Sequence, residues 1–186
     1  NKEEIVPLLR ALRWHGMDKD IWHRQVQSSR KRIKDARHWY YEIMELGYKY
    51  NMNDLMAAIG LAQLKKLDWM NVKRAQIIKK YLDGIKGCKN IIPSFPYDLE
   101  GSSYWLFSVR CSQRDNLINF LKMKGIATGV HFMPLPLHPL YKKYNQDVET
   151  ALTIWETLIT LPLFPGLKKE EIEYVIESLC EFDYKL

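Results

Sequence analysis

A lysine and an asparagine lie just before a long helical pattern, at a place where their side chains could bind an anion. Lys49 and Asn51 follow Gly47, and from Leu55 onward apolar residues recur at helical spacing. The free N–H groups at a helix N-terminus attract negative charge. The pattern predicts an anion-binding turn. The plainer alternative is an ordinary helix capped by Asn51 or Asn53, and the residues alone leave both open.

The elements that must position these side chains follow from the spacing of apolar residues and from glycine and proline. A helix over residues 1–14, ending at Gly16, precedes a long stretch without a regular pattern. A second, longer helix is expected over residues 51–83. The segment 88–99 is expected to be a linker, because Gly87, Pro93 and Pro96 interrupt any regular element.

The second half of the chain alternates between strands and helices. This order is typical of a small sheet covered by helices, an α+β unit. Trp105 and Trp155 are expected to pack in its core. The expected elements are a strand at 104–111, a helix ending at Gly125, a strand at 126–132, a helix at 147–159, an extended piece at 160–164 and a last helix at 168–181.

Composition limits the classes of protein to consider. The chain of 186 residues has 47% hydrophobic residues, enough for a sizeable core, and no apolar run near the roughly 20 residues that span a membrane. The opening residues do not form a signal peptide. Three widely spaced cysteines predict reduced thiols in a cytoplasmic protein, with no disulfide framework and no metal site. The net charge of +6 fits an anionic substrate or weak attraction to nucleic acid.

Five short motifs occur in order along the chain, and together they resemble one family. Each motif alone is weak, but the five in register resemble the DegT/DnrJ/StrS-type sugar aminotransferases, which use pyridoxal 5'-phosphate (PLP). The motifs lie at residues 12–16 (LRWHG), 47–64 (GYKYNMNDLMAAIGLAQL), 103–107 (SYWLF), 124–135 (KGIATGVHFMPL) and 161–167 (LPLFPGL).

The resemblance implies a fold and a division of the chain. The chain is similar to the C-terminal part of a fold type I PLP-dependent transferase, of α/β class with an α+β small domain, helix-rich and with a small, mostly antiparallel sheet. It implies that residues 1–50 are the tail of the large PLP-binding domain, with a variable basic loop at residues 24–37. It also implies a long connecting helix at 51–87 and a small C-terminal domain at 88–186.

The resemblance also implies that part of the catalytic machinery lies outside this chain. Transamination needs a lysine that holds PLP as a Schiff base and an acid beside the pyridine nitrogen. In the family the lysine comes shortly before the position that corresponds to Asn1, and no lysine here lies in a matching motif. The chain alone is therefore expected to be inactive and to carry no catalytic residue of its own.

Two residues of the turn at 47–54 match family positions that act across a dimer interface. The position of Lys49 is commonly an asparagine that reaches the phosphate of the partner's PLP, and a cation can serve a phosphate as well. The position of Asn51 is often an arginine that faces the sugar nucleotide. The neutral amide here weakens the case for a contact with the diphosphate.

Three further residues match substrate-binding positions. His131 and Phe132 correspond to a His-Tyr pair in the substrate site, although Phe132 lacks the hydroxyl group. His15 matches the histidine of the family's Leu-Arg-x-His-Gly turn. Each has a simpler alternative: His131 could be a core histidine, and His15 could cap the helix end. His138, between two prolines, is expected at the surface.

The function expected from the resemblance is conversion of a keto-sugar nucleotide to an amino-sugar nucleotide, with glutamate as amino donor, by a homodimer with shared active sites. Some relatives dehydrate instead, with histidine in place of the Schiff-base lysine. Two alternatives come from other classes. One is a binding or regulatory module that uses the basic loop for salt-sensitive nucleic-acid affinity. The other is a structural remnant that only dimerises.

Overall fold

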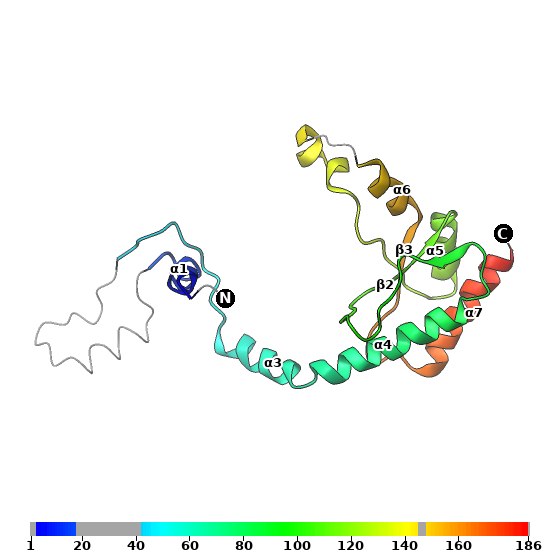
Figure 1. Cartoon of the computed structure of the whole chain (residues 1–186), viewed down its shortest axis with the longest axis horizontal. Helices are drawn as coiled ribbons and strands as arrows, with labels where there is room; N and C mark the ends of the chain where they lie inside the picture. Colours follow the sequence, from blue (N-terminus) through cyan, green and yellow to red (C-terminus); the bar gives the residue numbers. More distant parts are fainter. Residues whose placement is uncertain (1–2, 18–41, 145–147, 186) are drawn as a thin grey trace, which may run out of the picture. The chain divides into compact units, whose positions relative to one another are not determined.

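The chain divides into two compact units, residues 1–64 and residues 65–186. The computed structural model describes residues 3–17, 42–144 and 148–185 (Figure 1). The basic loop at 24–37 lies outside these residues.

The described residues of the first unit form two helices and a short pairing between segments. Helix α1 spans Ile5–Leu12 and helix α3 spans Asp54–Leu64. Single antiparallel bridges join Trp14 to Lys49 and Met17 to Ile43. The sequence predicted that the first helix ends at Gly16. In the structure this glycine follows the end of α1 and has a positive φ of 71°, as glycines after a helix C-terminus often do.

The long helix expected over residues 51–83 is two helices. Helix α3 ends at Leu64, and helix α4 spans Leu67–Gly84 after a turn at residues 65–66. The two residues of this turn are lysines, which are good helix formers. The residue types therefore gave no signal for a break, and it falls at the boundary between the two units.

Helix α3 is apolar all round and has no buried residue in the part of the chain that the structure describes. Leu55 is 77% exposed, Ile59 65% and Leu64 63%. The apolar residues that recur from Leu55 onward therefore form no buried face on α3. In α4, by contrast, Ile77, Ile78 and Tyr81 are buried. A helix of this composition normally packs against other chain on several sides.

The second unit is built on a three-stranded antiparallel sheet in the order β1-β2-β3. The strands span Ile91–Pro93, Phe107–Cys111 and Leu158–Leu161. In the register, Ile91 pairs with Cys111 and Phe107 pairs with Leu161. The small antiparallel sheet in a helix-rich unit confirms the expected fold class.

Three helices cover this sheet and form the core with it. They are α4, α5 (Arg114–Met123) and α7 (Lys169–Tyr184), and α4 packs beside α7 (Figure 1). Tyr81 of α4 stacks on Phe107 of β2 with ring centroids 5.1 Å apart, and its hydroxyl donates to the carbonyl oxygen of Pro162 at 3.0 Å. Burial raises the pKa of Tyr81, so its hydroxyl stays protonated and can donate.

Two sequence expectations differ from this arrangement. Strand β1 lies within the expected linker, where its edge position tolerates Pro93. The segment 126–132, expected to be a strand, pairs with the sheet only through an isolated bridge between Gly129 and Thr160. The proline-rich segment after it forms two 3-10 helices, η1 (Leu135–Leu137) and η2 (Pro139–Tyr144), before α6 (Glu149–Thr157).

Among the described residues, none of the helices has the length and apolar character needed to cross a membrane.

Candidate active site

Two glycines bring the end of α1 against the segment that contains Lys49. A Cβ atom added to Gly16 would lie 1.8 Å from the carbonyl oxygen of Glu45, and one added to Gly47 would lie 1.9 Å from the nitrogen of Gly16. Real side chains do not tolerate such distances. The close approach of the two backbone segments therefore requires glycine at both positions.

Backbone hydrogen bonds fix the register of this approach. The His15 N–H donates to the Tyr48 carbonyl at 2.9 Å, and the Tyr50 N–H donates to the Arg13 carbonyl at 2.9 Å. As a result Trp14 lies opposite Lys49 in the bridge. The motif at residues 12–16 and the motif at residues 47–64 thus form one local structure, in which His15 and Lys49 are both exposed.

Lys49 lies over the indole of Trp14, with Nζ 3.2 Å from the ring centroid. This is a cation–π contact, in which the ring face attracts the ammonium group. The contact restrains the lysine side chain but uses no oxygen acceptor. N–H donors of the ammonium therefore remain available for an anion.

Asn53, and not Asn51, caps α3. The Oδ1 atom of Asn53 accepts a hydrogen bond from the Met56 N–H at 2.9 Å, as an N-cap side chain does. Asp54 follows in the first turn, where a negative charge suits the helix dipole. Asn51 is half-buried and does not cap the helix.

In the second unit, His131 lines a cavity of about 440 Å³. Its Nδ1 atom is 3.0 Å from the Oγ1 atom of Thr160, and its ring meets Trp105 edge-on with centroids 6.2 Å apart. Other lining residues are Ser94, Phe95, Ser103, Tyr104 and Ile154. The cavity thus combines aromatic walls with hydroxyl groups and one imidazole, a composition suited to a polar organic ligand.

The position of the His131 ring depends on Gly129. Two backbone hydrogen bonds, of 3.0 and 2.7 Å, pair Gly129 with Thr160 at β3. A Cβ atom on Gly129 would lie 2.7 Å from Cε1 of His131. The glycine therefore leaves the space that the imidazole ring occupies, and β3 supplies the hydroxyl that orients it.

Two aromatic side chains near this cavity are exposed. Phe132 is 68% exposed, and its ring meets that of His131 edge-on at 4.8 Å. Trp105 is 65% exposed, so the expectation that it packs in the core is wrong. The alternation of the strand pattern placed Trp105 on a regular strand, but β2 begins only at Phe107 and leaves Trp105 at the cavity edge.

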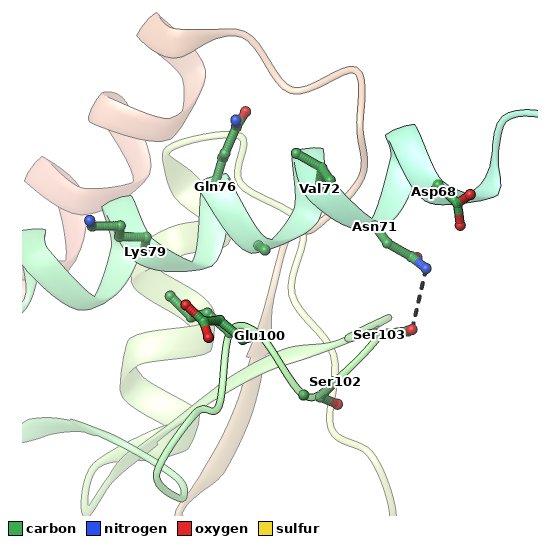
Figure 2. A pocket seen from close by; sticks show the side chains of 11 residues that line it. Asp68, Asn71, Val72, Gln76, Lys79, Glu100, Ser102 and Ser103 are labelled. Atoms are coloured by element: carbon green, nitrogen blue, oxygen red, sulfur yellow. Dashed lines mark hydrogen bonds between the residues drawn. The ribbon is translucent and has the colours of Figure 1, made fainter.

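A second, open cleft of about 630 Å³ lies between α4 and residues 99–103. Figure 2 shows Asn71 pointing from α4 toward Ser103, to which its Nδ2 atom donates at 3.2 Å. Ser102 and Ser103 line both this cleft and the His131 cavity. The sequence analysis did not predict this cleft. The one lining residue that belongs to a family motif is Ser103, the first residue of the motif at 103–107.

The structure thus places the predicted site residues in two groups. His15, Lys49 and Asn51 belong to the first unit, and His131 and Phe132 to the second. His138 is half-buried, just before η2. Within the described ranges, no cluster of three or more His, Cys, Asp or Glu side chains could hold a metal ion.

Several solved structures similar to this chain are described as aminotransferases or sugar aminotransferases. Spr1654 from Streptococcus pneumoniae, a candidate sugar aminotransferase solved in its PMP-form, has a TM-score of 0.83 and 32% identity, and the match covers all of this chain and 46% of that one. PseC from Helicobacter pylori, an aminotransferase of pseudaminic acid biosynthesis, has a TM-score of 0.84 at 21% identity, covering all of this chain and 48% of that one, which shows the fold alone.

Residues 1–180 match the DegT/DnrJ/EryC1/StrS aminotransferase family, and the chain belongs to this family. The spore coat polysaccharide biosynthesis protein SpsC of Bacillus subtilis is 33% identical over 188 residues, which are 95% of this chain and 46% of SpsC. An uncharacterized protein of Methanocaldococcus jannaschii is 33% identical over 189 residues, which are 96% of this chain and 47% of that protein. The chain spans about half the length of the curated relatives it matches.

These findings confirm the family and the fold that the five motifs predicted. They also bear on the cofactor, because Spr1654 has been solved in a PLP-form as well as in its PMP-form. The expectation of pyridoxal 5'-phosphate as cofactor thus agrees with the solved relatives.

Proposed function

We propose that the protein containing this chain is a PLP-dependent sugar aminotransferase, which converts a keto-sugar nucleotide to an amino-sugar nucleotide with glutamate as amino donor. The family match over residues 1–180 carries this proposal. The similarity to Spr1654, at 32% identity, supports the class of reaction. The similarity to SpsC, a polysaccharide biosynthesis protein, supports a sugar as the substrate.

The turn at residues 47–54 fits the phosphate end of PLP. Lys49 offers an exposed cation whose position the Trp14 ring restrains. Asn51 offers an amide that does not cap α3, because Asn53 fills that role. A phosphate dianion needs such charge-assisted donors. We assign Lys49 to the cofactor phosphate and Asn51 to the sugar nucleotide, both across a subunit interface.

The His131 cavity fits the sugar part of the substrate. The contact between Nδ1 and the Thr160 hydroxyl leaves Nε2 as the ring nitrogen available to a ligand in the cavity. Phe132 offers an exposed ring against which a sugar can pack. When bound, PLP supplies the electron sink that amino transfer requires. The residues of this chain bind and orient the substrate.

We propose that the protein acts as a homodimer with active sites completed by the partner subunit. The exposed, apolar surface of α3 supports a protein contact at this helix, since exposed apolar surface of this kind marks interfaces. The three cysteines are odd in number and widely spaced in the sequence, which supports a reducing, cytoplasmic setting.

The two half-reactions of the cofactor test this proposal. Glutamate added to the intact, PLP-loaded protein should change the absorption spectrum from that of PLP to that of the PMP-form, and a keto-sugar nucleotide should restore it. Lys49→Ala protein should need more PLP to reach the same loading. A protein that binds PLP but shows no spectral change with glutamate or any other amino acid would contradict an aminotransferase function.

A further inference from the structure

Two half-buried cysteines meet between segments that are far apart in the sequence. The Sγ atoms of Cys88 and Cys180 are 3.6 Å apart, although the residues are 92 positions apart in the chain. Cys88 follows the C-terminal end of α4, and Cys180 lies in α7. The third cysteine, Cys111, is buried in β2 at 1% exposure.

The approach of the two thiols is fixed by their surroundings. The Asp183 carboxylate accepts hydrogen bonds from the Lys89 N–H at 2.9 Å and the Asn90 N–H at 2.6 Å, which hold the segment after Cys88 against α7. The Cys180 thiol lies 3.7 Å from the Gly84 carbonyl oxygen. The two sulfur atoms are therefore held together by the junction of α4 and α7, and a disulfide needs only a small further approach.

We propose that Cys88 and Cys180 form a reversible disulfide when the protein meets a small-molecule disulfide of the oxidised glutathione class, and that this bond ties α7 to the end of α4. The reaction is a two-step thiol–disulfide exchange. The first cysteine attacks the oxidant as a thiolate, forms a mixed disulfide and releases one small thiol. The second cysteine attacks the mixed disulfide, forms the Cys88–Cys180 bond and releases the second small thiol. The protein loses two electrons and two protons, and the oxidant gains them.

The environment of Cys88 makes this reaction depend on pH. Burial, followed by the hydrogen bond to Cys180 and the nearby negative charge, raises the pKa of Cys88 to about 12. Cys88 therefore stays protonated at neutral pH. Because thiol–disulfide exchange needs a thiolate, formation of the bond should accelerate as the pH rises.

Peptide mapping tests the bond directly. The intact protein is incubated with oxidised glutathione, the remaining thiols are alkylated, and tryptic peptides are analysed by mass spectrometry. We expect a linked pair of residues 87–89 and 170–185, with Cys111 alkylated in its own peptide. Cys111→Ser protein should give the same linked pair, and Cys88→Ser protein should stop at a mixed disulfide on Cys180. Alkylation of all three cysteines, or a link that includes Cys111, would overturn the proposal.

Thermal unfolding tests whether the bond ties the two segments. A disulfide that closes a long loop restricts the unfolded chain, so oxidation should raise the Tm by at least about 5 °C. A reductant should reverse the rise, and Cys88→Ala and Cys180→Ser proteins should not show it. An unchanged Tm in protein that mass spectrometry shows to be linked would overturn the stabilising role.

Discussion

The Nδ1 atom of His131 lies 3.0 Å from the Oγ1 atom of Thr160, a β3 residue that is only 6% exposed. Backbone hydrogen bonds between Thr160 and Gly129 hold the two segments in register. The orientation of the imidazole in the cavity is therefore set by a strand of the sheet as well as by the segment that carries the histidine.

Removal of the Thr160 hydroxyl should loosen this orientation. A neutral hydrogen bond contributes about 0.5–1.5 kcal/mol, so Thr160→Val should raise the KM for the sugar nucleotide roughly three- to tenfold, with a smaller change in kcat. Steady-state kinetics of the intact enzyme measures both. Thr153→Val, on the exposed surface of α6, is the matched control and should leave the KM unchanged. An equal effect of both substitutions would contradict the orienting role.

A methyl group at position 129 should displace the His131 ring. In Gly129→Ala the new Cβ would lie 2.7 Å from Cε1 of His131, so the ring must give up its contact with Thr160. We expect kcat/KM to fall by roughly tenfold or more, since the ring would lose its place in the cavity. Gly87→Ala is the control, because nothing lies within 4 Å of the added atom. Full activity of Gly129→Ala protein would show that the position of the ring does not matter.

Loss of the Lys49 cation should weaken the binding of PLP. A charge-assisted hydrogen bond contributes about 1.5–3 kcal/mol, so Lys49→Ala should raise the Kd for PLP by roughly tenfold or more. Lys49→Asn, which restores the residue common in the family, should lie between Lys49→Ala and the unchanged protein. The control is Lys65→Ala, an exposed lysine after α3. Titration of PLP into the apoprotein measures the Kd, and equal values for all four proteins would refute the assignment.

The ion pairs of Glu181 should make stability depend on pH in acid. Hydrogen bonds from Lys124 and Lys185, each at 2.6 Å, lower the pKa of Glu181 from 4.5 to about 2. A carboxylate whose pKa is lower in the folded state stabilises the fold above pH 4.5 and loses this effect as the pH falls from 4.5 to about 2.

The Tm should therefore fall more steeply through this range in the unchanged protein than in Glu181→Gln protein. The three side chains are partly exposed, so high salt should reduce the difference. Parallel pH profiles of the two proteins would contradict the role of Glu181.

Several parts of the fold were predictable because each rests on local signals. Apolar periodicity indicated α5, α6 and α7, and Gly16 and Gly125 marked the ends of helices with positive φ. The five motifs predicted the family. Two of these motifs contain Trp14 and Lys49, which pair in the structure. The glycines that allow this pairing, Gly16 and Gly47, belong to the same two motifs.

Other features depend on contacts that a pattern of residues does not encode. The break after α3 falls at two helix-forming lysines, and β1 is an edge strand that contains a proline. Whether Asn51 or Asn53 caps α3 was decided only by the position of one side chain. Trp105 lies at a cavity edge, because the strand starts two residues after it.

The most direct test of the central claim is transfer of nitrogen from glutamate to a sugar nucleotide. The intact enzyme is incubated with PLP, ¹⁵N-glutamate and a panel of keto-sugar nucleotides, and the products are analysed by mass spectrometry. We expect ¹⁵N in an amino-sugar nucleotide, with a much lower yield from His131→Ala protein. A product that has lost water and gained no nitrogen, or no product from PLP-loaded protein, would contradict an aminotransferase function.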